Sequence, residues 1–316
     1  MSARHARGSQ SVVIRSGSIV FVFMLLGATV AESLAALPLI RRHRADVQNT
    51  VRVAGLTWHT DYVAAYREAR NEKRMLLINF VPLGDRRTQR NLDRAIRRDP
   101  RLQEKLQNMV LARLPEDHEV KLDGRWKRLI DDASFQHLAG RPGITIVDLA
   151  HDGAPYYGCA VTALPFSSGK YYRWQPGHLR VAVVLPPGTI TQRTMIWAVR
   201  THPESPASTL GDCHPALAEA AAKQSDYQAR IGVQGHHNWN VRFHQVSTAA
   251  GAGSASEVVA ESWPNQDLID SCVDCVQSWR QSPGHWGAVR RRHRLFGYDI
   301  RRGRNGIWYG TGIFAN

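Results

Sequence analysis

Histidine side chains stand at two places where the chain is expected to turn. His285 follows the tripeptide Ser-Pro-Gly, which ends a predicted helix that carries Trp279. His236 and His237 directly follow another predicted helix, which ends near Gly232. An imidazole can exchange a proton near neutral pH and can bind a metal ion, so these three histidines are candidate functional residues.

Two carboxylates lie between these histidines in the sequence. Glu257 and Glu261 belong to the stretch Ser-Glu-Val-Val-Ala-Glu-Ser, which we predict as a short helix capped by Ser254 or Ser256. Their four-residue spacing places both carboxylates on one face of such a helix. If Glu261 does not belong to a functional site, it is an ordinary solvated helix residue.

Four cysteines offer a second kind of chemistry. They are Cys159, Cys213, Cys272 and Cys275, the last two in the sequence Cys-Val-Asp-Cys. We predict that this pair lies on the apolar side of a helix, as buried thiols or with one disulfide to Cys213, in preference to a metal site. A redox pair is a further reading, but it needs an exposed thiol of low pKa at a helix N-terminus.

The first residues have the pattern of an export signal. Three arginines precede the short apolar run 16–31, and small residues follow that suit cleavage. If uncut, the segment is about long enough to anchor in a bilayer. We therefore predict that residues 1–44 are a signal peptide or membrane anchor and that the protein is secreted or held in the cell envelope. The alternative is a buried apolar helix of a cytoplasmic protein.

The chain is strongly basic. Its 316 residues carry a formal net charge of +14. Such a balance suits nucleic acid, anionic lipid or an acidic cell-wall polymer. No nucleic-acid recognition motif is present, so a nucleic-acid partner is not expected. We expect the arginines near the C-terminus to form a solvated basic edge that can contact an anionic surface.

Strands and helices alternate after a short linker, which predicts an α/β sheet with helices on its faces. The short apolar run Met-Leu-Leu-Ile-Asn-Phe-Val is typical of a strand that is buried on both faces. The predicted strands are 75–81, 109–114 and 144–149. The predicted helices start at residue 62 and cover 87–108, 126–138 and 190–202.

This order resembles a thioredoxin-like domain over about residues 58–202. Pro142 precedes a predicted strand, where that fold carries a cis-proline. The chain departs from the redox enzymes after Phe80, where Pro-Leu-Gly-Asp-Arg-Arg replaces Cys-x-x-Cys. Thiol–disulfide exchange needs a thiolate. The resemblance therefore implies a redox-inactive thioredoxin-like domain over residues 45–205, followed by a boundary rich in Pro, Ser and Thr.

The last part begins with a helix and ends with a hairpin. We predict helices over about 214–232 and 266–279, and an Asn-Gly turn at Asn305 joins the two strands of the hairpin. With Trp-x-x-Ser-Pro-Gly-His between helix and hairpin, this order resembles the CAP superfamily of cysteine-rich secretory, antigen 5 and pathogenesis-related proteins. The short bacterial members are the most similar.

The CAP resemblance implies an α–β–α sandwich over residues 206–316, with two histidines and one or two glutamates in a cleft. His285, Glu257 and His236, or its neighbour His237, fit these positions. Glu261 could stand in for the second glutamate. Two imidazoles and a carboxylate suit a divalent metal such as zinc, or acid–base chemistry. The family's Gly-Glu-Asn reads Ser-Glu-Val here, which removes the glycine and asparagine contacts.

These inferences predict an α/β protein of two domains, exported or membrane-anchored, whose cleft binds a ligand or a metal ion. The thioredoxin-like domain would be its scaffold. A cell-envelope ligand, a lipid or an anionic polymer would be the partner. The alternative is a hydrolase that acts on peptide, lipid or cell-wall material through the same cleft. No Gly-x-Ser-x-Gly or His-Glu-x-x-His motif supports that alternative.

Overall fold

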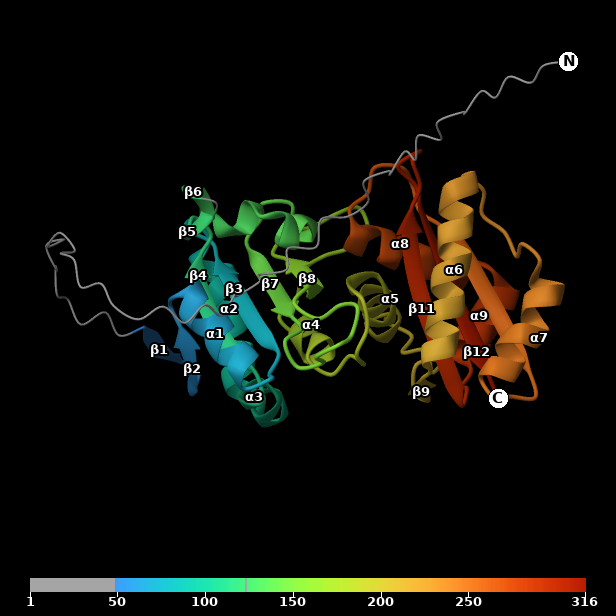
Figure 1. The fold of residues 1–316 in the computed structure, drawn as a ribbon, viewed down its shortest axis with the longest axis horizontal. Helices are drawn as coiled ribbons and strands as arrows, with labels where there is room; N and C mark the ends of the chain where they lie inside the picture. Colours follow the sequence, from blue (N-terminus) through green and yellow to red (C-terminus); the bar gives the residue numbers. More distant parts are fainter. Residues whose placement is uncertain (1–48, 123) are drawn as a thin grey trace, which may run out of the picture. The chain divides into compact units, whose positions relative to one another are not determined.

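The structure is a computed structural model that describes residues 49–316 except residue 123. The predicted signal peptide or anchor, residues 1–44, lies outside the described residues. Within the described part, no helix is both long and apolar enough to span a bilayer. The described chain is mixed α/β, with one large and one smaller mixed sheet (Figure 1).

The first sheet has six strands in the order β1-β2-β4-β3-β7-β8. Its centre is β3, parallel to β4 and antiparallel to β7. The predicted strands at 75–81, 109–114 and 144–149 are present with small shifts of their ends. The six strands are β1 (Thr50–Val53), β2 (Leu56–His59), β3 (Leu76–Val81), β4 (Val110–Pro115), β7 (Gly143–Val147) and β8 (Ala160–Pro165).

Three helices accompany this sheet before β7. The helix α1 (Tyr62–Asn71) begins at Asp61, whose carboxylate accepts a hydrogen bond from Ala64 N. The predicted single helix over 87–108 is instead two helices, α2 (Arg86–Arg98) and α3 (Pro100–Gln107). The break lies at Asp99, which precedes a proline and has extended backbone angles. A proline disfavours helical geometry in the residue before it, so the correction follows from the sequence itself.

The helix predicted over 126–138 is wrong. Strand β5 (Glu119–Leu122) pairs with β6 (Arg125–Arg128), and two 3₁₀ helices, Leu129–Asp131 and Ala133–Leu138, follow. The second of these is interrupted at Phe135, which has φ −112°, and it is followed by Ala139 in the left-handed region. The expected cis-proline is also absent, because no described peptide bond is cis.

The second sheet has the strand order β10-β12-β11-β9. The hairpin of β11 (Leu295–Arg302) and β12 (Trp308–Ala315) confirms the predicted one, and Gly306 takes a positive φ of 78° in its turn. The helix expected around Glu257 is wrong: this stretch is strand β10 (Ala255–Glu261), paired with β12. Its two consecutive valines favour a strand over a helix. The short β9 (Asp212–Cys213) pairs with β11.

Helices cover both faces of this second sheet. On one face, α6 (Pro215–Ile231) packs its Leu217 and Ala221 against Ile313 of β12. Gly297 of β11 permits this close approach, because a Cβ there would lie 2.2 Å from Ala218 N. On the other face lie α8 (Leu268–Gln281) and α9 (Pro283–Arg290). The helix α7 (Trp239–Ala249), which the sequence analysis does not predict, contacts α6 and β10.

The helix α5 (Ile190–Arg200) joins the two parts of the chain. It packs against β8 of the first sheet and against both β11 and α8 of the second part. Its Met195 and Trp197 belong to a hydrophobic core that also contains Leu77 from β3 and Trp279 from α8. The described residues 49–316 thus belong to one compact unit. The boundary between residues 205 and 206 stays a prediction.

A buried carboxylate also ties these parts together. Asp270 of α8, 4% exposed, accepts hydrogen bonds from the backbone N–H groups of Lys170, Tyr171 and Tyr172 at 3.2, 2.7 and 2.7 Å. Nearby, Arg141 pairs with Asp267 at 2.6 Å. Since buried N–H groups must find acceptors, the loop around residue 171 is fixed by α8.

Candidate functional site

The loop that carries His236 is held by two buried glutamines of α6. Gln228 accepts a hydrogen bond from Gly235 N at 3.0 Å, and Gln224 donates to the Gly235 carbonyl at 2.7 Å. Gln228 also donates to Thr311 of β12, at 3.1 Å. These contacts connect the His236 loop to the helix and to the sheet, so its backbone position is well determined by its surroundings.

Glu257 projects from β10 beneath this loop, with a side chain that is fully buried. One carboxylate oxygen, Oε1, lies 3.0 Å from Nδ1 of His236. The other, Oε2, accepts a hydrogen bond of 2.6 Å from Nη2 of Arg242. A buried carboxylate is costly without partners, and here both oxygens have one. The carboxylate therefore fixes the orientation of the His236 ring.

His285 faces His236 from the first turn of α9, which begins at Pro283. The sequence predicted a simple turn at this place, and the turn is the start of a further helix. The two Nε2 atoms lie 3.2 Å apart, and the ring centroids lie 5.5 Å apart. Burial lowers the pKa of His285, and the neighbouring His236 lowers that pKa further. At neutral pH His285 is therefore an uncharged imidazole.

The Glu257 carboxylate determines where the ring protons lie in the hydrogen-bonded series Glu257, His236 and His285. The ionised Glu257 carboxylate can only accept, so Nδ1 of His236 donates to it, and Nε2 carries a lone pair in this tautomer. A lone pair on Nε2 of His285 as well would make the 3.2 Å contact repulsive. One proton or one cation between the two nitrogen atoms removes that repulsion. The ring proton of a neutral His285 fills this place when it lies on Nε2, and a metal ion could replace that proton.

The other two predicted site residues do not join this group. The ring of His237 lies against Tyr227, with Nε2 3.2 Å from the Val233 carbonyl. Glu261 is exposed at the far end of β10, opposite Tyr309 of β12. Four residues of strand correspond to about 13 Å, which separates Glu261 from Glu257.

Arg242 is the site residue that the sequence interpretation missed. It lies on α7, where its Nε donates a hydrogen bond of 3.0 Å to the carbonyl of His237. Its Cζ lies over the ring of Trp239, 5.1 Å from the ring centroid. Its Nη1 is closed off from solvent and has no hydrogen-bond partner in the described part of the chain. A general argument predicts a residue of this kind: a buried glutamate next to a histidine needs a cation that balances its charge.

The donor set fits a metal ion only in part. The described residues contain no group of three or more His, Cys, Asp and Glu side chains that could hold one. The predicted set of His236, Glu257 and His285 does come together, but Glu257 stands behind His236 and faces away from the two Nε2 atoms. Zinc–nitrogen bonds of about 2.0–2.1 Å at a tetrahedral angle separate two nitrogen ligands by about 3.3 Å. The observed 3.2 Å matches that separation.

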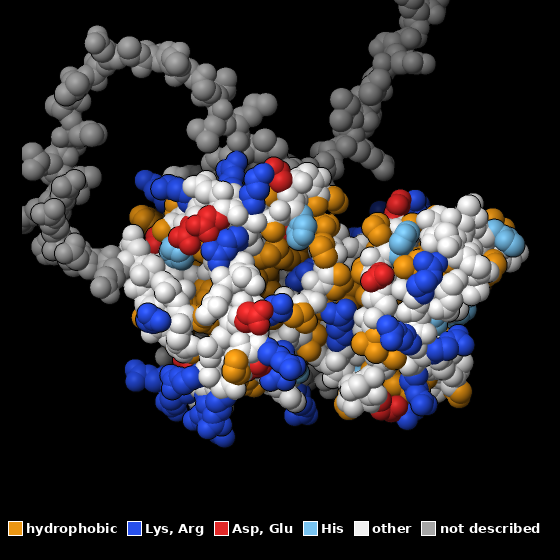
Figure 2. All heavy atoms as spheres, turned by 90° about the horizontal axis from the view of Figure 1, so that it is seen from below, with side chains coloured by type: hydrophobic (Ala, Val, Ile, Leu, Met, Phe, Trp, Pro, Cys, Tyr) orange, Lys and Arg blue, Asp and Glu red, His pale blue; other side chains and the backbone are white. Residues whose placement is uncertain are grey.

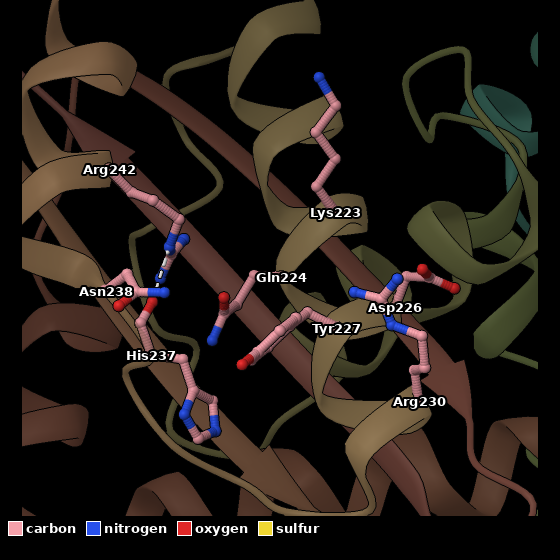
Figure 3. A pocket seen from close by; sticks show the side chains of 8 residues that line it. All are labelled: Lys223, Gln224, Asp226, Tyr227, Arg230, His237, Asn238 and Arg242. Carbon is pink, nitrogen blue, oxygen red and sulfur yellow. Dashed lines mark hydrogen bonds between the residues drawn. The ribbon is translucent and has the colours of Figure 1, made fainter.

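A cavity of about 300 Å³ lies between α6 and the start of α7, and Arg242 is one of its lining residues (Figure 3). In Figure 3, Lys223, Tyr227 and Arg230 extend from α6, and a dashed line joins Arg242 to the carbonyl of His237. Arg242 therefore contacts both the cavity and Glu257. A ligand in the cavity would lie next to the residue that balances the buried carboxylate.

The cysteines do not contribute to this site. All four thiols are free, so the disulfide with Cys213 is not formed. Cys272 and Cys275 are fully buried in the middle of α8, and burial raises the pKa of both thiols. A redox pair needs the opposite environment.

Three comparisons with known proteins concern the resemblances stated for the sequence. Comparison of the chain with protein-family models, with curated proteins and with solved structures found no match. The CAP-like and thioredoxin-like assignments therefore stay predictions.

Proposed function

We propose that this chain is an exported or membrane-anchored binding protein whose CAP-like part binds a divalent metal ion such as zinc. The observation that carries the proposal is the 3.2 Å separation of the Nε2 atoms of His236 and His285, with Nδ1 of His236 held by Glu257. Histidine ligands commonly donate their second ring N–H to a carboxylate, which fixes the tautomer and raises the basicity of the ligating nitrogen.

The arrangement of elements supports the CAP-like assignment. A helix is followed by a histidine loop, a strand that carries the glutamate, a helix, the Ser-Pro-Gly-His turn and a hairpin. Helices lie on both faces of the sheet. Residues 45–205 would form the thioredoxin-like scaffold, which has no cysteine between β3 and α2, where the redox enzymes carry Cys-x-x-Cys.

In this proposal each residue has one task. His236 and His285 would ligate the ion through Nε2, and solvent or a ligand's own atoms would complete the coordination. Glu257 keeps the His236 ring in place, and Arg242 balances the charge of Glu257. Zinc bound in this way would supply a Lewis acid that can coordinate an anionic ligand.

Calorimetric titration with zinc tests the proposal. His285→Ala should abolish zinc binding, since it removes one of two protein ligands, while circular dichroism stays unchanged. His237→Ala is the matched control, because its ring faces Tyr227 and not the Nε2 pair. Equal loss in the two variants, or unchanged binding in His285→Ala, would reject the metal site.

The second candidate function is hydrolysis. The pair of His236 and Glu257 has the form of a general base oriented by a carboxylate, and the His236 side chain is 43% exposed. Turnover of a peptide, ester or cell-wall substrate without added zinc, lost in both His236→Gln and His285→Ala, would favour the hydrolase. Tight zinc binding without turnover of any such substrate would favour the binding protein.

A further inference from the structure

The helix α2 has an unusual concentration of positive charge. Six of its 13 residues are arginine. They are Arg86, Arg87, Arg90, Arg94, Arg97 and Arg98, and all six are exposed. Figure 2 shows that Lys and Arg side chains predominate over Asp and Glu on one face of the molecule. We call the six side chains of this helix the α2 arginine face.

The α2 arginine face occupies one side of the helix. At 100° per residue, the six positions fall within an arc of about 120°. The opposite side is apolar: Leu92 and Ile96 are fully buried in the core, and Gln89 is hydrogen-bonded to Asn79 of β3 at 3.2 Å. The helix is thus fixed to the sheet by one side and presents its cations outward from a rigid base.

The six arginines form no ion pair with a described carboxylate, although Asp85 interacts electrostatically with Arg87. Each of the six arginines lacks an ion-pair partner among the described residues. Nearby acids are occupied elsewhere: Asp93 makes two hydrogen bonds to Arg113, and Asp99 pairs with Arg180 while it caps α3. Asp85 caps α2 itself, through the N–H groups of Arg87 and Thr88.

The arrangement is unfavourable for the isolated protein. The series Arg86, Arg90, Arg94 and Arg98 places like charges four residues apart, where they repel. Arg86 and Arg87 also lie at the positive N-terminal end of the helix dipole. Repulsion without internal compensation is relieved when an external anionic surface supplies the counter-charge.

We propose that the α2 arginine face binds the headgroups of an anionic phospholipid membrane. Clusters of four to eight basic residues on one side of a helix are typical of such contacts. Leu83, an apolar side chain that is 60% exposed, lies three residues before the first residue of the helix and can enter the interface. Residues 86–107 contain no aromatic side chain that could stack on nucleic-acid bases. This proposal is independent of the metal site.

Sedimentation with lipid vesicles tests the proposal on the full chain. Vesicles of phosphatidylcholine alone are compared with vesicles that also contain phosphatidylglycerol, at low and high salt. The test variant combines Arg87→Gln, Arg90→Gln, Arg94→Gln and Arg97→Gln, since glutamine preserves helix propensity. The control variant combines Arg291→Gln, Arg292→Gln, Arg302→Gln and Arg304→Gln, which are also exposed and lower the net charge equally.

The two variants should differ strongly. Each arginine near an anionic surface contributes roughly a fivefold factor, so the test variant should lose several hundred-fold in partitioning to phosphatidylglycerol vesicles. The control variant should lose less than about tenfold, and high salt should weaken the wild type. Binding that is common to both vesicle types is subtracted, because an apolar N-terminal segment would cause it.

Three results would overturn the proposal. One is equal loss in the two variants, which would show that net charge alone is responsible. Another is a test variant that binds phosphatidylglycerol vesicles like the wild type. The third is wild-type binding to duplex DNA without any preference for the anionic vesicles, which would assign the α2 arginine face to nucleic acid.

Discussion

The variant Glu257→Gln tests the connection between buried charge and the histidine pair. Glutamine has the size of glutamate and its carbonyl can still accept the Nδ1 proton of His236, but its amide group would face the guanidinium of Arg242. Removing one partner of a buried ion pair costs about 3–5 kcal/mol. The Arg242 side chain is 20% exposed and is therefore not fully buried. We expect a smaller loss of unfolding free energy, about 2–3 kcal/mol.

A double-mutant cycle separates the role of Glu257 in stability from its role at the histidines. Urea unfolding followed by circular dichroism gives the free energies for the wild type, Glu257→Gln, Arg242→Gln and the double variant. The double variant leaves no unpaired charge, so the coupling energy should be about 1–3 kcal/mol. Its zinc affinity should stay about 10–100-fold below that of the wild type, as in Glu257→Gln. Strictly additive losses, or a Glu257→Gln protein as stable as the wild type, would refute this account.

Three other predictions concern stability, pH and thiol chemistry. Asp270→Ala leaves three backbone N–H groups without an acceptor and should lower the unfolding free energy by about 3 kcal/mol or more, as measured in urea. Burial lowers the pKa of His178 to about 4, so the unfolded chain takes up its proton first; unfolding should become easier as the pH falls from about 6.5 to 4, and a proton-resonance titration of His178 that gives an ordinary pKa would contradict this. A thiol reagent should modify the exposed Cys159 quickly in the native protein, and Cys272 and Cys275 only after unfolding.

The sequence predicted the elements whose patterns are local. The apolar run of β3, the helix that ends at Gly232 and the Asn-Gly hairpin are all present. Each depends on a signal contained in a few neighbouring residues: burial on both faces, a glycine with positive φ, or a turn dipeptide. The same holds for the break at Asp99, which the following proline indicates.

The remaining elements depend on partners far along the chain. Strand β10 was mistaken for a helix because two glutamates at helical spacing were weighted above two β-branched valines, and its partner β12 lies about 50 residues away. The residues 125–128 form a strand because they pair with β5. His236 and His285 were predicted to meet, but the orientation of Glu257 depends on Arg242, whose helix the sequence interpretation missed.

The strand order of the second sheet sets a condition on how the protein is made. Strand β12 lies between β10 and β11, and β10 pairs with no other described strand. On the ribosome, β10 therefore stays unpaired until β12 has been synthesised, although the strands of the first sheet can already pair. Glu257 and His236 cannot reach their final positions before that moment. If the chain is exported, the residues of the second sheet must cross the membrane unfolded, or a chaperone must hold them until β12 has been synthesised.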